Sequence, residues 1–463
     1  MANEIKEQGL IERTLKEISQ PFIDLFHTSR ALFGLNFSYL IEGFTYFGVL
    51  GYLTLFFNDY VGLNDINAGQ MVGVLTAGIT LSMLFLGATV DWIGLRRALI
   101  YALSFMFFGR ALLSAAPSLG SSGLWGSTHI LSMLGILGIV IGYGIYQPAA
   151  YAGVKKLTTE KTAAMGYAML YALMNLGGFL PGIIAPAVRK HTSMLTMMWV
   201  YAIITVLGIA VVYFIITKKA YNKAVDDANK EKNNVEEEDN DELTKMTFGE
   251  KVQFYIKNFP LRDLRFLFFI FILIPVQTLF AHNWLTLPAY FKRAFEGTVS
   301  EYFEFFTNFN PVLIFVLTPV VTALTSKKNT YKMMIIGTFV MAAPAFFLST
   351  GPSMTAVFAY LVVMSIGEAM WQPRFLQWVA EIAPKNMTGI YMGIGQFPWF
   401  LTKIITSLYS GWFLMNYCPD NTLPSQMNTG TMWMIYGCIA LISPLGLFLA
   451  RSWMIKGFKT KHE

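Results

Sequence analysis

Long apolar runs alternate with short polar segments along almost the whole chain, and they recur roughly every 25–35 residues. Each run is long enough to cross the hydrocarbon core of a bilayer, which takes about 20 residues of α-helix. The pattern predicts twelve membrane-spanning helices, at 31–57, 68–90, 97–116, 128–150, 162–186, 194–217, 264–290, 303–324, 331–350, 354–377, 388–413 and 431–453.

A charged segment divides these runs into two groups of six. Residues 218–262 are strongly charged, contain the acidic run EEEDNDE (Glu236–Glu242) and hold no apolar stretch of spanning length. We interpret them as a cytoplasmic linker between six-helix bundles at 31–217 and 263–453. The linker is either a solvated tether or a docking element for a partner.

Both ends of the chain are charged. In the N-terminal segment, 1–30, the apolar residues from Ile11 to Phe22 follow i, i+4, i+7, i+11 spacing. This spacing is typical of an amphipathic helix that lies on the membrane surface or packs on the protein's own cytoplasmic face. A basic tail, 454–463, follows the last apolar run.

Composition supports a membrane protein. Hydrophobic residues make up 55% of the 463 residues and charged residues 13%, about half the usual share in soluble domains. This excludes an ordinary cytosolic globule and a disordered chain. The net charge of +6 does not indicate nucleic acid, because Lys and Arg are gathered in short segments between the apolar runs.

The basic residues also predict the orientation. With the N-terminus inside, the outer loops hold only Arg189, Lys190, Lys292 and Arg293, and the other interhelical clusters face the cytoplasm. We therefore expect both termini in the cytoplasm, and a place in the cell membrane, which is the inner membrane in a bacterium.

Enzyme and cofactor chemistry find no support in the sequence. The two cysteines, Cys418 and Cys438, can form neither a disulfide framework nor a zinc site. The five histidines lack metal-ligand spacing, and P-loop and HExxH patterns are absent. We expect a protein that is not an enzyme and has no cofactor.

Several ionisable residues fall at membrane depth within the apolar runs, and we single out Glu42, Arg110, His282, Glu368 and Lys403. Intramembrane charge is costly and commonly marks a solute pathway or a proton site. The alternative for each is a structural role, as in an ion pair, a backbone hydrogen bond or a place facing water. Further candidates for a solute-binding lining are Tyr39, Tyr46, Tyr146, Asn175, Trp284 and Asn310.

The segment GATVDWIGLRR follows the second apolar run and resembles the helix 2–3 signature of the major facilitator superfamily. Glycines allow a tight turn there, and an acid can accept from N–H groups at a helix end. The resemblance implies a cytoplasmic gate, whereas the arginines alone could be a positive-inside anchor. The gate candidates are Gly87, Asp91, Gly94, Arg96 and Arg97.

Five further segments resemble signatures of the proton-dependent oligopeptide transporter family, in order along the chain. They are EGFTYFG from Glu42, GYGIYQP from Gly142, YALMNLGG from Tyr171, NPVLIFVLTP from Asn310 and GEAMWQP from Gly367. The resemblance covers most of the chain and indicates a divergent branch of that family.

The departures from the family pattern concern its charged residues. Tyr39 stands where the family has its first helix 1 glutamate, and Gly43 replaces the helix 1 arginine. In helix 4, Gln147 replaces a lysine, and in helix 7, Val276 takes the place of an acid. Losing opposite charges together avoids a stranded buried charge. We interpret these changes as a solute-binding site in which the family's charged residues have been replaced in pairs, and we take Gln147 as a binding candidate.

The expected fold is all-α, with twelve helices in two six-helix halves of the major facilitator type. The resemblance implies alternating access and proton-coupled symport of a small organic solute, peptide-like or peptide-derived, with Glu42 and Glu368 as proton acceptors. The expected partners are the solute, protons and the bilayer, and the working unit is a monomer. The alternatives are an exporter of drugs or amphipathic metabolites, and a non-transporting membrane scaffold or receptor.

Overall fold

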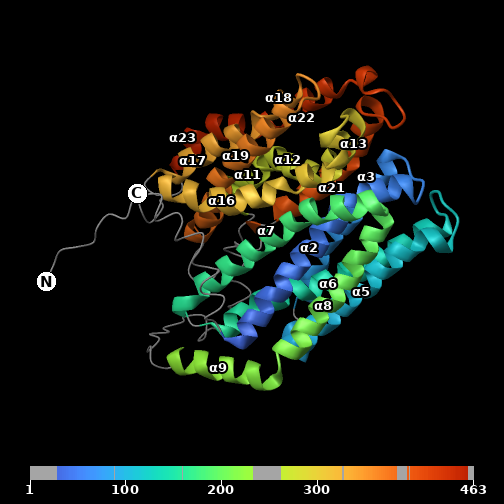
Figure 1. Cartoon of the computed structure of the whole chain (residues 1–463). Helices are drawn as coiled ribbons and strands as arrows, with labels where there is room; N and C mark the ends of the chain where they lie inside the picture. The colour runs from blue at the N-terminus through green and yellow to red at the C-terminus, as the bar shows by residue number, and fades with distance from the viewer. Residues whose placement is uncertain are drawn as a thin grey trace. The chain divides into compact units, whose positions relative to one another are not determined.

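We describe the fold from a computed structural model of residues 29–87, 89–158, 160–232, 262–325, 328–382, 394–395 and 397–456 (Figure 1). Residues 1–28 of the amphipathic segment expected at 1–30, the acidic run at 236–242 and most of the tail lie outside the described residues.

Every regular element among the described residues is a helix. In the first part of the chain these are α2 (Arg30–Asp59), α3 (Asp65–Leu86), α4 (Thr89–Ile93), α5 (Leu95–Leu119), α6 (Ser127–Leu157), α7 (Glu160–His191), α8 (Met194–Ile215) and α9 (Lys218–Lys232). The second part contains α11 (Leu264–Ile272), α12 (Ile274–Leu285), α13 (Leu287–Ala294), α14 (Thr298–Glu301), α15 (Phe303–Thr307), α16 (Phe309–Thr325), α17 (Thr330–Ala342), α18 (Ala345–Leu348), α19 (Met354–Ile382), α21 (Phe397–Tyr417), α22 (Thr429–Leu449) and α23 (Arg451–Ile455), with a short 3₁₀ turn at Pro424–Gln426.

The all-α membrane fold is confirmed. In the described part of the chain, ten helical stretches are long and apolar enough to cross a membrane, and they lie at ten of the twelve predicted positions. The predicted span at 303–324 is divided between α15 and the apolar α16. The predicted span at 388–413 corresponds to α21, which continues to Tyr417.

Two predicted spans are interrupted at prolines. The run 264–290 forms α11, α12 and α13, and Pro275 and Pro288 lie in the first turns of the second and third pieces. The run 331–350 is broken at Pro344, between α17 and α18. A proline lacks the N–H that continues a helix, so it fits best at the start of a new segment.

The chain forms two compact units. The first groups residues up to Gly62 with Gly78–Lys232 and Tyr302–Lys327. The second groups Leu63–Ala77, Asn233–Glu301 and Lys328–Glu463. Each unit thus contains a segment from both predicted sequence halves.

In the first unit, α2 is the most buried span and packs against α7 and α8. The helices α5 and α6 also pack closely, because Gly109 and Gly135 face each other. A Cβ atom on Gly109 would lie 2.5 Å from the Gly135 carbonyl oxygen, and one on Gly135 would lie 2.7 Å from that of Gly109. Small residues are what allow membrane helices to approach so closely.

In the second unit, α12 packs against α21 and α22, and α17 packs against α19 and α22. Large aromatic side chains fill the interior, and Trp371 and Trp433 are fully buried. Gly337 allows the close packing of α17 on α19, since a Cβ there would lie 2.9 Å from the Trp371 Cβ.

The beginning of the predicted linker is more ordered than a solvated tether. Residues 218–232 form α9, which packs against α2 and α6 (Figure 1). Its buried residues are small, Ala224 and Ala228, and they lie one turn apart on one helix face. This helix is part of the first unit.

Candidate functional site

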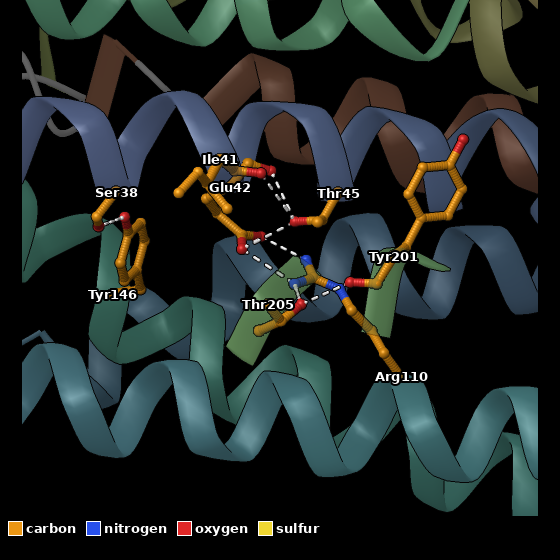
Figure 2. A network of polar contacts seen from close by, with 8 residues as sticks. All are labelled: Ser38, Ile41, Glu42, Thr45, Arg110, Tyr146, Tyr201 and Thr205. Carbon is orange, nitrogen blue, oxygen red and sulfur yellow. Dashed lines mark hydrogen bonds and ion pairs between the residues drawn. The ribbon is translucent and has the colours of Figure 1, made fainter. Parts of the chain in front are cut away.

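The centre of the first unit holds a buried ion pair between Glu42 of α2 and Arg110 of α5 (Figure 2). Arg110 Nη2 donates to Glu42 Oε1 at 2.5 Å, and Nη1 donates to Oε2 at 3.0 Å. Glu42 is 0% exposed and Arg110 is 1% exposed. Two of the charges predicted at membrane depth therefore meet in one bidentate contact.

Hydroxyl groups support both members of the pair. Thr45, one turn along α2, donates to Glu42 Oε2 at 3.1 Å. Thr205 of α8 accepts from Arg110 Nη1 at 2.7 Å and donates to the Tyr201 carbonyl at 2.9 Å. Arg110 Nε is buried and has no acceptor among the described residues. The pair is held by three helices and keeps one unused donor.

Aromatic side chains surround the pair on α2 and α6. Tyr39 stacks on Tyr146 with centroids 5.9 Å apart, and Tyr46 lies 4.8 Å from the ring of Tyr143. The Tyr146 hydroxyl lies 2.5 Å from Ser38 Oγ. Tyr46 is half-buried, whereas Tyr39 and Tyr146 are buried. Three tyrosines taken as binding candidates thus belong to one cluster beside Glu42.

The position where the family resemblance expected an arginine is closed by helix packing. A Cβ atom on Gly43 would lie 2.7 Å from the Met174 carbonyl oxygen of α7. On the facing helix, a Cβ on Gly177 would lie 2.4 Å from the Leu40 carbonyl oxygen. The α2–α7 contact leaves no room for a long side chain at residue 43.

A second buried carboxylate of the first unit was not singled out in the sequence. Glu304 of α15 is 3% exposed and is bound in a bidentate manner by Arg189, near the end of α7, through Nε and Nη2. Tyr52 of α2 donates to Glu304 Oε1 at 2.7 Å. The guanidinium carbon of Arg189 also lies 5.1 Å from the ring centroid of Phe303.

The second unit contains a comparable pair. Arg293 of α13 donates to both carboxylate oxygens of Asp65, at 2.7 and 2.8 Å. It also donates to the Cys418 carbonyl at 3.1 Å, and Asp420 lies 3.8 Å away. Asp65 and Arg293 are both nearly buried.

These two ion pairs give a structural role to Arg189 and Arg293, which the sequence analysis assigned to outer loops. Arg189 and Arg293 fitted the orientation pattern, but each binds a buried acid from the other half of the sequence. Acids at the ends of apolar runs are common, so Asp65 and Glu304 carried no special signal.

His282 lies in the interior of the second unit and is 0% exposed. Its Nδ1 lies 2.7 Å from Thr286 Oγ1, and its Nε2 lies 3.1 Å from the Tyr409 hydroxyl. Its ring stacks on Tyr436 with centroids 3.9 Å apart. Both ring nitrogens are thus engaged. Trp284, on the same helix, packs edge-on against Phe280.

The remaining candidates are distributed over both units. In the first unit, Asn310 is buried, Gln147 is half-buried, and Asn175 donates to the Tyr171 carbonyl of its own helix at 2.9 Å. In the second unit, Glu368 of α19 is 4% exposed and Lys403 of α21 is half-buried.

At the predicted gate, Gly94 adopts φ +82°, a conformation that favours glycine, just before α5. Arg96 donates to the Tyr213 carbonyl at 3.1 Å and its guanidinium lies 4.8 Å from the Tyr213 ring, whereas Arg97 is exposed. A Cβ on Gly87 would lie 2.6 Å from the Met83 carbonyl oxygen. The Asp91 side chain is outside the described residues.

No cluster of three His, Cys, Asp or Glu side chains suited to a metal ion occurs in the described part of the chain. The side chains named in the first unit's site are carboxylates, guanidinium groups, hydroxyls and aromatic rings.

Comparisons with solved structures show the fold. A peptide transporter POT in complex with sulfate matches with a TM-score of 0.66 and 18% identity, over 92% of this chain and 95% of that one. A POT family transporter in complex with 5-aminolevulinic acid gives the same TM-score and identity, over 92% and 97%. A D-xylose–proton symporter matches with a TM-score of 0.65 and 16% identity, over 90% and 97%.

Comparison of the sequence with curated proteins gave no match. The sequence profile of the major facilitator superfamily matches residues 35–407, which is most of the chain. The protein is thus a multi-pass membrane transporter rather than an enzyme, and it belongs to the major facilitator superfamily.

Proposed function

We propose that this secondary transporter is a proton-coupled symporter of a small organic solute, peptide-like or peptide-derived, that works by alternating access. The observation that carries the proposal is the Glu42–Arg110 pair, buried within membrane-spanning helices and surrounded by tyrosines. Protonatable groups at such depth commonly belong to solute or proton pathways.

The pair supplies a physical basis for coupling. Protonation of Glu42 would leave Arg110 as an uncompensated buried cation, which is strongly unfavourable. An anionic group of the solute could then take the place of the carboxylate. Proton and solute would bind together. Protonation of Glu42 frees Arg110 for the solute anion, and the solute anion compensates the charge of Arg110 that protonation leaves unpaired. Thr205 and the unused Arg110 Nε would help to orient such a group.

Glu368 is the second proton acceptor in this proposal, because it is a buried acid within the GEAMWQP segment that resembles the family pattern. Lys403 offers a further cation for an anionic solute in the second unit. A single chain is sufficient for this mechanism. We place both termini in the cytoplasm and the protein in the cell membrane, on the distribution of Lys and Arg.

One buried ion pair of the first unit would respond to opening of the outer side. Arg189–Glu304 joins the two halves of the sequence within that unit. Under the proposed orientation both residues belong to the outer side, and separation of this pair would accompany opening to the outside.

The solute is proposed to differ from an ordinary dipeptide. A dipeptide carries a carboxylate and an ammonium group, and the close α2–α7 contact leaves no space at Gly43 for the arginine of the family pattern, so a solute anion would have to reach Arg110 on α5 instead. The named neighbours bind sulfate and 5-aminolevulinic acid, both of which are anionic or carry a carboxylate. We therefore favour a solute with an anionic group placed to reach Arg110 or Lys403, or a solute with no carboxylate at all.

Two steps test the proposal. The purified protein is screened by thermal shift against di- and tripeptides, amino acids, sugars and lipids. A stabilising compound is then offered to proteoliposomes with an imposed inward proton gradient. Accumulation that collapses with a protonophore supports symport. Loss of preloaded compound driven by the same gradient would indicate efflux, and gradient-independent equilibration would contradict proton coupling.

A further inference from the structure

One tyrosine of α8, Tyr201, lies between the two buried carboxylate pairs of the first unit and is linked to them through Thr205 and Tyr52. At its backbone end, the Tyr201 carbonyl accepts from Thr205, which in turn accepts from Arg110. At its side-chain end, its ring lies beside that of Tyr52, with centroids 6.3 Å apart, and Tyr52 donates to Glu304. Figure 2 shows the Tyr201 side chain extending along α2, away from the Glu42–Arg110 pair.

The ring fits against α2 because residue 48 is glycine. A Cβ atom at Gly48 would lie 2.2 Å from Tyr201 Cζ and 2.6 Å from the phenol oxygen. The ring also packs edge-on against Phe44, with centroids 5.3 Å apart. Its position is therefore fixed by contacts along one face of α2, between the levels of Glu42 and Tyr52.

The phenol oxygen of Tyr201 is buried and has no hydrogen-bond partner among the described residues, and the same holds for the Thr307 hydroxyl. Tyr201 and Thr307 line a small hollow together with Tyr52 and Glu304. Buried hydroxyls are nearly always hydrogen-bonded. The Tyr201 phenol is therefore a donor in the same hollow as the Glu304 carboxylate.

We infer that Tyr201 is a positioning residue that links the Arg189–Glu304 pair to proton binding at Glu42. When Arg189 leaves Glu304, the carboxylate requires a new donor, and the Tyr201 phenol lines the same hollow. A shift of this part of α8 toward Glu304 moves Tyr201 and Thr205 together, because Thr205 bonds to the Tyr201 carbonyl within the same helix, and Thr205 then supports Arg110 of α5 less well. Arg110 holds the Glu42 carboxylate less tightly, so Glu42 binds a proton more readily.

We call this link from Glu304 through Tyr201, Thr205 and Arg110 to Glu42 the relay. It rests on the proposed function, because it takes Glu42 as a proton acceptor. Glu42 is faced by Arg110 of α5 and by four phenols, those of Tyr39, Tyr46, Tyr143 and Tyr146. Glu304 is faced by Arg189 of α7, Tyr52 of α2 and Tyr201 of α8. A competing route runs along α2 itself, which carries both Glu42 and Tyr52.

The test measures protons on Glu42 without any solute. Infrared difference spectra of the purified protein are recorded against pH, and the carboxylic acid band that disappears in Glu42→Gln is assigned to Glu42. The shift caused by Arg189→Gln is then compared in wild-type, Tyr201→Phe and Tyr290→Phe backgrounds. Tyr290 is a buried tyrosine of the second unit and serves as the matched control.

In the wild-type and Tyr290→Phe backgrounds, Arg189→Gln should raise the midpoint of the Glu42 band by about one pH unit, a tenfold gain in proton affinity. In Tyr201→Phe that shift should fall below about a third of a unit, a twofold change. Thr205→Val, at the other end of the relay, should abolish the shift as well.

A full shift in both Tyr201→Phe and Thr205→Val would overturn the relay and assign the coupling to α2. A wild-type protein with no titrating Glu42 band would instead contradict the proton acceptor of the proposed function, which is a separate failure.

Discussion

Arg293 and Asp65, which are 228 residues apart in the sequence, form a bidentate and nearly buried ion pair. The pair connects α13 to the first turn of α3, and Arg293 also holds the carbonyl of Cys418 after α21. Three separate segments of the second unit therefore depend on one guanidinium group.

Removing one partner of this pair should destabilise the second unit. Arg293→Met leaves the Asp65 carboxylate buried without its cation, at a cost of about 3–5 kcal/mol. The double variant Arg293→Met/Asp65→Leu should recover most of this loss, because no charge is left stranded. Thermal unfolding of the single and the double variant in detergent measures both changes in stability. Equal losses in the single and double variants would indicate that packing, not charge, is responsible.

The rate at which the Cys418 thiol is labelled should depend on the same Arg293–Asp65 ion pair. Burial raises the pKa of its thiol to about 12, so almost no thiolate is present at pH 8. In a Cys438→Ser background, a water-soluble maleimide should leave Cys418 unlabelled as long as the Arg293–Asp65 pair is intact. Arg293→Gln should raise the labelling rate at least about tenfold, because the segment at Cys418 loses its anchor and the thiol becomes accessible. An unchanged rate would show that Cys418 is shielded independently of Arg293.

Two glycines of α2 should respond in opposite ways to alanine. Gly43→Ala places a methyl group 2.7 Å from the Met174 carbonyl oxygen, so we expect a loss of about 1–3 kcal/mol from overpacking. Gly51→Ala meets its nearest atoms at 3.8 Å and should be neutral or stabilising by about 0.5–1 kcal/mol. Melting temperatures of the two variants provide the comparison, and a destabilised Gly51→Ala with a stable Gly43→Ala would refute the α2–α7 packing.

The membrane spans and the fold class could be predicted from the sequence because each span is marked by the length of its own apolar run. That length does not depend on which helix packs against it. The proline breaks near Pro275 and Pro344 were visible only in the structure, since membrane helices also accommodate prolines such as Pro148 without a break.

The charged residues of the candidate site were predicted singly, but their partnerships were not. Glu42 and Arg110 stood out as intramembrane charges, yet their contact depends on how α2 and α5 are rotated in the bundle. Glu304 and Asp65 lie at helix starts, where an acid is ordinary on helix-dipole grounds, so nothing local marked them as buried.

Simple dipeptides should bind weakly. Residue 43 of α2 has no space for the arginine of the family pattern, and Arg110 lies on a different helix, α5, so the cation is not where that pattern places it. Thermal-shift competition with a dipeptide library, repeated with Lys403→Ala and Arg110→Gln proteins, measures this. Micromolar binding of many unmodified dipeptides that survives both substitutions would show that the recognition site lies elsewhere.

Glu368→Gln should abolish proton-driven accumulation while the protein still folds and inserts. The amide keeps the shape of the buried side chain but cannot take up a proton. Uptake into proteoliposomes under an imposed proton gradient checks this, with insertion verified by size-exclusion and protease protection. Full accumulation in the variant would remove Glu368 from the coupling mechanism.

Coupling through Glu42 is tested most directly by comparing gradient-driven uptake with solute exchange in Glu42→Gln proteoliposomes, using the compound found by thermal shift. In exchange, the loaded carrier reorients without net proton movement. We expect Glu42→Gln to retain exchange at a substantial fraction of the wild-type rate but to lose accumulation and solute-dependent proton influx. Proton influx and accumulation equal to wild type in Glu42→Gln would contradict this expectation.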